Sequence, residues 1–128
     1  MMTNNITIWN AGSEVRKALL ASSKLKAKVN GAISPLIAKE GTKFPFIVYQ
    51  KSGGWYDYNK DSVTGGTVNI DVIVFADKYE DLCEVCDLVD DAMYSYFTNA
   101  GSLPKLMGSD ENFQDDVYYQ PLTFQFKI

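Results

Sequence analysis

The sequence predicts an α+β domain with two helices packed on one face of an antiparallel sheet of four to five strands. Two stretches, residues 8–29 and 77–101, repeat apolar side chains at three- and four-residue steps, which is the period of an amphipathic helix. Extended stretches lie between and after them, and short loops between strands favour antiparallel pairing. With 128 residues, of which 46% are hydrophobic, the chain has the size of one domain, 1–128.

The first helix is predicted within residues 8–29. Its apolar face consists of Val15, Ala18, Leu19, Ser22, Leu25 and Val29. Most of the charged side chains of this stretch lie off that face. We expect a break near Ser22 and an end near Gly31, because glycine is favoured just past a helix C-terminus.

The middle of the chain predicts strands. Residues 32–38 are a short extended stretch, and Pro35 predicts either an edge position or an irregular segment for it. Residues 44–50 are apolar on both faces, which predicts a strand covered on both sides. Residues 52–66 are expected to form a long excursion, and 67–76 a strand that completes a long antiparallel hairpin. The buried face of that last strand is predicted to be Val68, Ile70, Val72 and Val74.

The second helix has the strongest pattern. Asp77 is its expected N-cap, because a side-chain oxygen there accepts a hydrogen bond from a free helical N–H. Its core stripe is Leu82, Cys86, Val89, Met93 and Tyr96. A polar loop is predicted through Gly108 and Asp110, and an alternating strand over 119–128 closes the chain. A further strand at 113–118 is the alternative that separates four strands from five.

Composition excludes several functions. The chain has no histidine, so the commonest general base and metal ligand is missing. It carries a net charge of −4 with Arg16 as its single arginine, which argues against specific nucleic-acid binding. No run approaches the ~18 apolar residues of a membrane span, and residues 1–7 do not read as a signal peptide. We expect a soluble protein made in a cytoplasm.

Catalytic, cofactor and metal sites are not predicted. Cys83 and Cys86 form a CxxC pair, but it lies inside a helix without further zinc ligands, so core packing is the favoured interpretation. Residues 110–116 resemble a calcium loop only loosely, because Asp115 occupies the position that requires glycine. Asp90 and Asp91 are adjacent on a helix and point about 100° apart. The sequence has no nucleophile elbow, P-loop or dinucleotide fingerprint.

Charge is unevenly distributed along the chain. Residues 1–60 hold nine cations and three anions, whereas residues 61–128 hold three cations and thirteen anions. The favoured interpretation is two solvated faces of one domain. The alternative is head-to-tail self-association, in which a basic patch on one copy meets an acidic patch on the next.

The aromatic cluster in residues 52–66 is the candidate interface. Trp55, Tyr56 and Tyr58 lie between two glycine pairs in a polar segment, and Lys60 follows them. Aromatic side chains are enriched at the buried centres of protein interfaces. Two interpretations remain open: the rings fold back over their own sheet, or they contact another subunit or partner.

Five segments, in this order and spacing, carry a family resemblance: residues 18–22, 31–36, 41–50 and 68–79 with the following helix, and the alternating terminal strand. Together they resemble the tail-completion (tail-terminator) family of long-tailed bacteriophages and prophages. The resemblance implies a structural protein that forms a ring, usually a hexamer, which caps the finished tail tube and joins it to the head connector. It implies no catalytic residues, no cofactor, assembly in the bacterial cytoplasm and a final place in the virion tail.

Two other functions stay open at this point. The first is a monomeric neck adaptor or head-closure protein that docks onto the connector. The second, less favoured, is an uncharacterised bacterial enzyme, which would require a deep pocket with convergent carboxylates.

Overall fold

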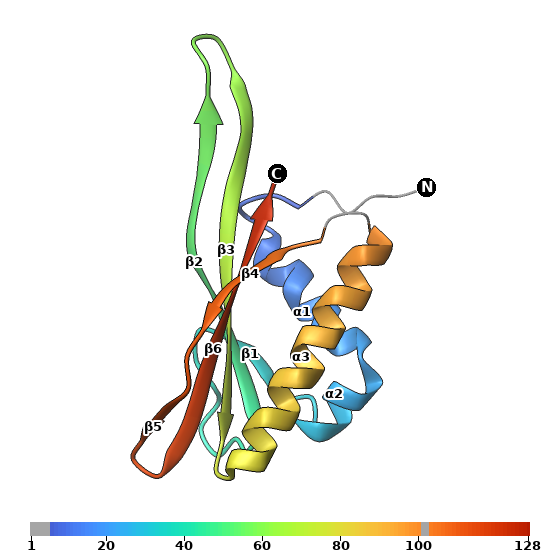
Figure 1. The fold of residues 1–128 in the computed structure, drawn as a ribbon, viewed down its shortest axis with the longest axis vertical. Helices are drawn as coiled ribbons and strands as arrows, with labels where there is room; N and C mark the ends of the chain where they lie inside the picture. The colour runs from blue at the N-terminus through green and yellow to red at the C-terminus, as the bar shows by residue number, and fades with distance from the viewer. Residues whose placement is uncertain (1–5, 101–102) are drawn as a thin grey trace.

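The computed structural model describes residues 6–100 and 103–128, and it confirms the α+β class (Figure 1). The helices are α1 (Ala11–Ala21), α2 (Ser23–Lys28) and α3 (Tyr79–Ala100). The strands are β1 (Ile33–Pro35), β2 (Phe46–Tyr58), β3 (Val63–Ala76), β4 (Lys105–Ser109), β5 (Asn112–Gln114) and β6 (Val117–Lys127). All three helices lie on one face of the sheet, as the sequence predicts (Figure 1).

The sheet has six strands in the order β1-β2-β3-β6-β4, with β5 also paired to β6. Every pair is antiparallel except β1 and β2, which are parallel through the register Ile33 to Ile47. The expected antiparallel sheet therefore gains one strand and one parallel pair. The connection from β1 to β2 is an irregular loop of residues 36–45, without a helix, and its shortness had suggested antiparallel neighbours.

The core lies between the sheet and the helices. The predicted face of β3 is confirmed, because all four of its valine and isoleucine side chains are fully buried. The α3 stripe is largely confirmed: Leu82, Val89 and Met93 are buried, while Cys86 and Tyr96 are half-buried. Other core residues of α3 are Val85, Ala92 and Phe97. The alternation of apolar side chains on β3 and their 3.6-residue period on α3 thus identify the faces of the sheet and the helix that pack together.

The predicted break in the first helical region is confirmed at Ser22. This residue has an extended backbone and its Oγ accepts a hydrogen bond from the Leu25 N–H at 3.2 Å, so it ends α1 and caps α2. The predicted stop is confirmed as well. Asn30 and Gly31 both have positive φ, of 52° and 69°, a backbone conformation that cannot continue a right-handed helix.

Residues 52–66 form a two-stranded ribbon, where the sequence predicted a loop excursion within a long hairpin. The hairpin is confirmed, but β2 continues to Tyr58 and β3 begins at Val63, which leaves only a four-residue turn. Gly54 and Gly66 do not turn the chain; each instead lets a neighbouring segment approach the backbone closely. A Cβ on Gly66 would lie 2.9 Å from the Trp55 carbonyl oxygen, and one on Gly54 would lie 3.0 Å from Ile8 Cγ2. The ribbon projects beyond the rest of the fold (Figure 1).

The end of the chain also departs from expectation. The predicted polar loop contains β4, and the alternative strand at 113–118 is β5 followed by a turn into β6. Asp115 and Asp116 form this turn with φ of 54° and 64°, as a tight hairpin requires. The predicted N-cap is one residue too early, because α3 begins at Tyr79 and Asp77 precedes it by two positions.

Candidate protein interface

The β2–β3 ribbon carries all four residues predicted to form an interface. Tyr58 is 70% exposed and Trp55 is 48% exposed, while Tyr56 is half-buried and packs against the core. The rings of Tyr56 and Tyr58 meet edge to face at 6.5 Å. Lys60 is exposed in the turn. Each of the two interpretations therefore applies to different residues. Tyr56 folds back onto its own domain, whereas Trp55 and Tyr58 are exposed and could contact a partner.

The ribbon is held at its base by contacts that the sequence did not reveal. The Lys51 Nζ lies 4.7 Å from the centre of the Trp9 ring and donates a hydrogen bond to the Ile8 carbonyl at 3.1 Å. Trp9 is 77% exposed, so a second large ring lies at the surface beside Lys51, at the base of the ribbon. A hollow of about 410 Å³ lies nearby, bordered by Ile6, Thr7, Tyr56, Val63, Thr64, Gly65 and Ile128.

The sheet face opposite the helices carries a row of aromatic rings. Phe46 lies 5.3 Å from Phe44 and 4.9 Å from Phe75, and Phe75 lies 5.9 Å from Tyr119, measured between ring centres. We call these four residues the aromatic row. Residues 44–50 were predicted to be covered on both faces. Ile47, Val48 and Tyr49 are all buried, which confirms cover on both faces for that part of the strand. The aromatic row, in which Phe46, Phe75 and Tyr119 are half-buried, is a feature of this face that the sequence analysis did not predict.

The other half of this sheet face is polar and internally hydrogen-bonded. Asp71 Oδ1 accepts hydrogen bonds from Ser52 Oγ at 3.2 Å and from Thr123 Oγ1 at 2.7 Å. Gln125 donates to Asn69 at 3.1 Å in the same ladder. Because these polar groups already have partners, the apolar part of this face is the part suited to exclude water with another protein.

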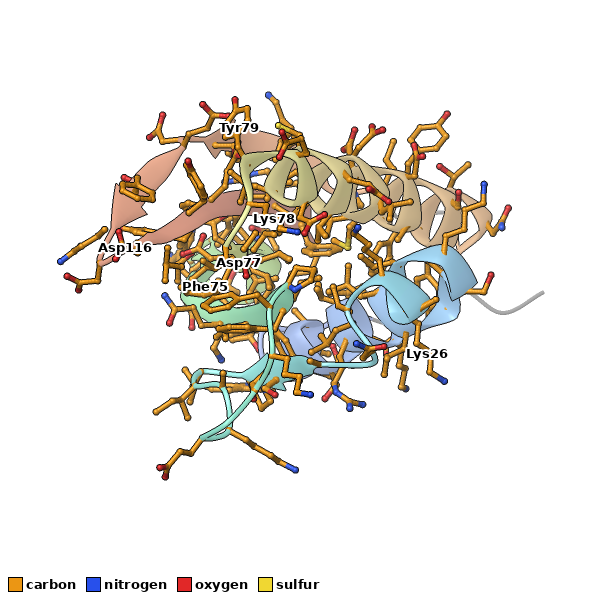
Figure 2. All side chains as sticks on the ribbon, turned by 90° about the horizontal axis from the view of Figure 1, so that it is seen from below. Lys26, Phe75, Asp77, Lys78, Tyr79 and Asp116 are labelled. Atoms are coloured by element: carbon orange, nitrogen blue, oxygen red, sulfur yellow. The ribbon has the colours of Figure 1, made fainter. Side chains whose placement is uncertain are left out.

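Most acidic and most basic side chains belong to different elements of the fold. The acidic side chains of α3 are Glu80, Asp81, Glu84, Asp87, Asp90 and Asp91, and the helix carries no cation. Lys26 on α2 and Asp116 after β5 lie on opposite sides of the molecule (Figure 2). The two halves meet at Lys28, whose Nζ lies 2.9 Å from Asp81 and 3.3 Å from Glu84. Its hydrogen bonds to Asp81 and then Glu84 raise the pKa of Lys28.

The cysteine pair does not have the geometry of a redox or metal site. Cys86 is half-buried and its Sγ lies 3.5 Å from Gln120 Oε1, to which it donates. Burial raises the pKa of the Cys86 thiol to about 12. Cys83 is exposed, so the core-packing interpretation is wrong for that residue and applies only partly to its neighbour.

We expect one thiol per native chain to react rapidly with Ellman's reagent at pH 8. Cys83 is exposed, whereas a pKa of about 12 leaves Cys86 with a thiolate fraction of only about 10⁻⁴ at that pH. Absorbance of the released thiolate should show one fast equivalent in buffer and two in denaturant. The C83S variant is the control and should show no fast equivalent; two fast equivalents in the native wild type would contradict the burial of Cys86.

Neither the cavities nor the acidic side chains of the described residues form a catalytic or metal site. A cavity of about 430 Å³ lies between α3 and the α1–α2 junction, and Asp91 is the one carboxylate among its described lining residues. Within residues 6–100 and 103–128, no three side chains of the metal-ligating types gather at one point. No helix in that part of the chain has both the length and the apolar character needed to cross a membrane.

Comparison with a solved structure identifies the fold. A chain from the structure titled "Virion of native gene transfer agent (GTA) particle" superposes with a TM-score of 0.73 at 13% sequence identity. The match covers 94% of this chain and 93% of that chain, so the two chains share nearly the whole fold. No curated protein matches the sequence.

Comparison with family models gives the identity. The family described as "Tail completion protein gp17" matches residues 13–106, which extend from α1 into β4. This is a family of structural virion proteins of the phage tail and not of enzymes. Because the match covers most of the chain, including the interface candidates on the ribbon, the chain belongs to the tail completion protein gp17 family.

Proposed function

We propose that this protein assembles as a ring, six copies in the form that the family resemblance implies, which caps the tail tube and joins it to the head connector. The observation that carries the proposal is the family match over residues 13–106. The similar fold of a chain from a gene transfer agent virion supports it further. The ring would be assembled in the host cytoplasm and remain in the virion tail.

The physical requirements of a ring agree with the surfaces described above. A ring is built from a heterologous contact, in which one patch on each copy meets a different patch on the next copy. Residues 36–44, with Lys39 and Lys43, and residues 110–118, with four carboxylates, supply two different patches of opposite charge. The ribbon adds Trp55 and Tyr58, two large aromatic side chains that are exposed in the single chain and that an interface would bury.

A monomeric neck adaptor is the second candidate, and one observation favours it. The core is complete within a single chain, since Phe97, Phe126 and Leu19 are fully buried without a partner. A chain with its own complete core can fold as a monomer and dock afterwards.

Light scattering at increasing protein concentration separates the two. A ring is expected to approach an integral multiple of 14.3 kDa, with six as the expected multiple. A mass that stays at 14.3 kDa over the whole range would contradict self-assembly and favour the adaptor. A matched chain with both ribbon aromatics replaced, described in the Discussion, reports whether the ribbon takes part.

A further inference from the structure

We propose that neighbouring copies contact each other head to tail through two surfaces at opposite edges of the sheet. The first, the basic arm, is the loop of residues 36–44 that follows β1. The second, the acidic hairpin, comprises residues 110–118 together with Tyr79 at the start of α3. The proposal rests on the proposed function, because it identifies the intersubunit contact of that ring.

The basic arm exposes apolar and cationic side chains together. Leu36 is 72% exposed and Ile37 is 77% exposed, and Lys39 and Lys43 are both exposed beside them. Glu40 is the single anion of the arm. An apolar surface ringed by charge, and lacking cover in the described chain, has the composition of a contact surface.

The acidic hairpin presents packed aromatic rings, which we call the platform, and its charge is opposite to that of the basic arm. The Phe113 ring lies 4.6 Å from Tyr118, which in turn lies 5.7 Å from Tyr79. The Tyr79 hydroxyl donates a hydrogen bond to Glu111 at 2.5 Å, so the hairpin is tied to α3. Phe113 is 58% exposed and Tyr79 is 44% exposed.

The charge of this platform is strongly acidic. Residues 110–118 contain four carboxylates, Asp110, Glu111, Asp115 and Asp116, and no cation. The positive charge of Lys78 and the negative charge of Glu80, on either side of Tyr79, offset each other. The platform therefore offers an apolar centre with an anionic rim, which complements the apolar centre and cationic rim of the basic arm.

The positions of the two surfaces determine the kind of assembly. The strand order places β1 at one edge of the sheet, and β4 and β5 at the other. Seen from below, the basic arm and the acidic hairpin, with Asp116 at its tip, extend from opposite edges of the sheet (Figure 2). A second copy that docks its arm on the hairpin of the first leaves its own hairpin free for a third copy. Such a contact is heterologous, which is the kind of contact that the proposed ring requires.

Two-fold pairing of like surfaces is disfavoured by the same charges. Hairpin against hairpin would bring eight carboxylates together, and arm against arm would bring four lysines together. The occupant that fits each surface is therefore the unlike surface of a second copy of this chain.

Charge reversal tests the contact. The arm variant is K39E/K43E and the hairpin variant is D110K/E111K, which leaves the left-handed turn at Asp115 and Asp116 unchanged. Each variant alone should associate at least ~tenfold more weakly than wild type in light scattering, because it places like charges across every contact. An equimolar mixture should recover the mass of the wild-type assembly, because the acidic arm of one variant meets the two introduced lysines on the hairpin of the other, and the unchanged arm and hairpin meet as in wild type. K24E/K26E on α2, outside both surfaces, changes the net charge as much as K39E/K43E does and should assemble as wild type does.

The possible results distinguish an error in the arm–hairpin contact from an error in the proposed ring. If wild type assembles and both variants assemble equally well alone, the contact is wrong and the ring stands. If neither variant assembles and the mixture also fails, although melting curves show folded protein, the head-to-tail arrangement is wrong. If wild type stays at 14.3 kDa at every concentration, both proposals are contradicted.

Crosslinking gives a second readout that does not depend on charge. In a C83S background, I37C places a thiol on the arm and F113C places one on the hairpin. Mild oxidation should give a ladder of multimers beyond the dimer on a denaturing gel, and each variant that carries only one of the two introduced cysteines should give none of these larger species. A band pattern that ends at the monomer would overturn the contact.

Discussion

Replacement of Phe97 by alanine is expected to lower the free energy of unfolding by about 3–5 kcal/mol. The Phe97 side chain is fully buried in α3, and its ring lies 5.0 Å from Phe126 on β6 and 4.9 Å from Tyr96. It therefore joins the helix layer to the sheet, and its removal leaves a cavity that these rings fill only partly. The midpoint and slope of urea unfolding, followed by circular dichroism, measure the loss.

The matched control is Tyr94→Ala, three residues earlier on the same helix. Tyr94 is 60% exposed, so its removal should change the unfolding free energy by no more than about 0.5 kcal/mol. Both variants introduce alanine into α3, which makes their helix propensities comparable. Equal effects of the two substitutions would contradict the packing of α3 on β6.

The elements that the sequence predicted well are those whose local pattern coincides with their burial. Alternation over 67–76 corresponds to β3, whose inward valines and isoleucine are fully buried. The seven-residue steps from Leu82 to Val89 and from Cys86 to Met93 follow the face of α3 that meets the sheet. In both cases the environment of a side chain is fixed by its own element, so a one-dimensional pattern is sufficient.

The elements that the sequence missed depend on distant partners. All five residues of β4 are exposed and it pairs only with β6, so no buried face marks it in the sequence. The parallel pairing of β1 with β2 depends on the position at which the chain leaves α2 and enters the sheet. The glycines of the ribbon indicated turns, yet Gly66 is needed because the Trp55 carbonyl passes within 2.9 Å of where its Cβ would be.

The candidate interface was predicted in part for the same reason. The ribbon aromatics are neighbours in sequence, so Trp55 and Tyr58 were found by composition alone. The aromatic row gathers residues from the loop before β2 and from β2, β3 and β6, and a single sequence does not show that they meet. The apolarity of both faces of residues 44–50 correctly predicts a strand covered on both sides at Ile47, Val48 and Tyr49, but it does not show which rings from other elements gather beside them.

The double substitution Trp55→Ser and Tyr58→Ser is expected to weaken self-association ~100-fold or more. Aromatic side chains at the centre of an interface contribute about 2 kcal/mol or more each, and each 1.4 kcal/mol is about tenfold in affinity. Both side chains are substantially exposed in the single chain, so the loss should fall on assembly and not on folding. Light scattering measures the mass, and a melting curve measures the stability of the variant.

The control for this substitution is Tyr94→Ser, which removes an equally exposed ring from α3, away from the ribbon. It should leave the assembly mass unchanged. Tyr56 is left intact because it packs against the core, and its loss would confuse folding with assembly. Wild-type mass in the double variant would remove the ribbon from the intersubunit contact. In that case Trp55 and Tyr58 would be available to bind the tail tube or the head connector, and the edge-to-edge contact alone would have to hold the ring together.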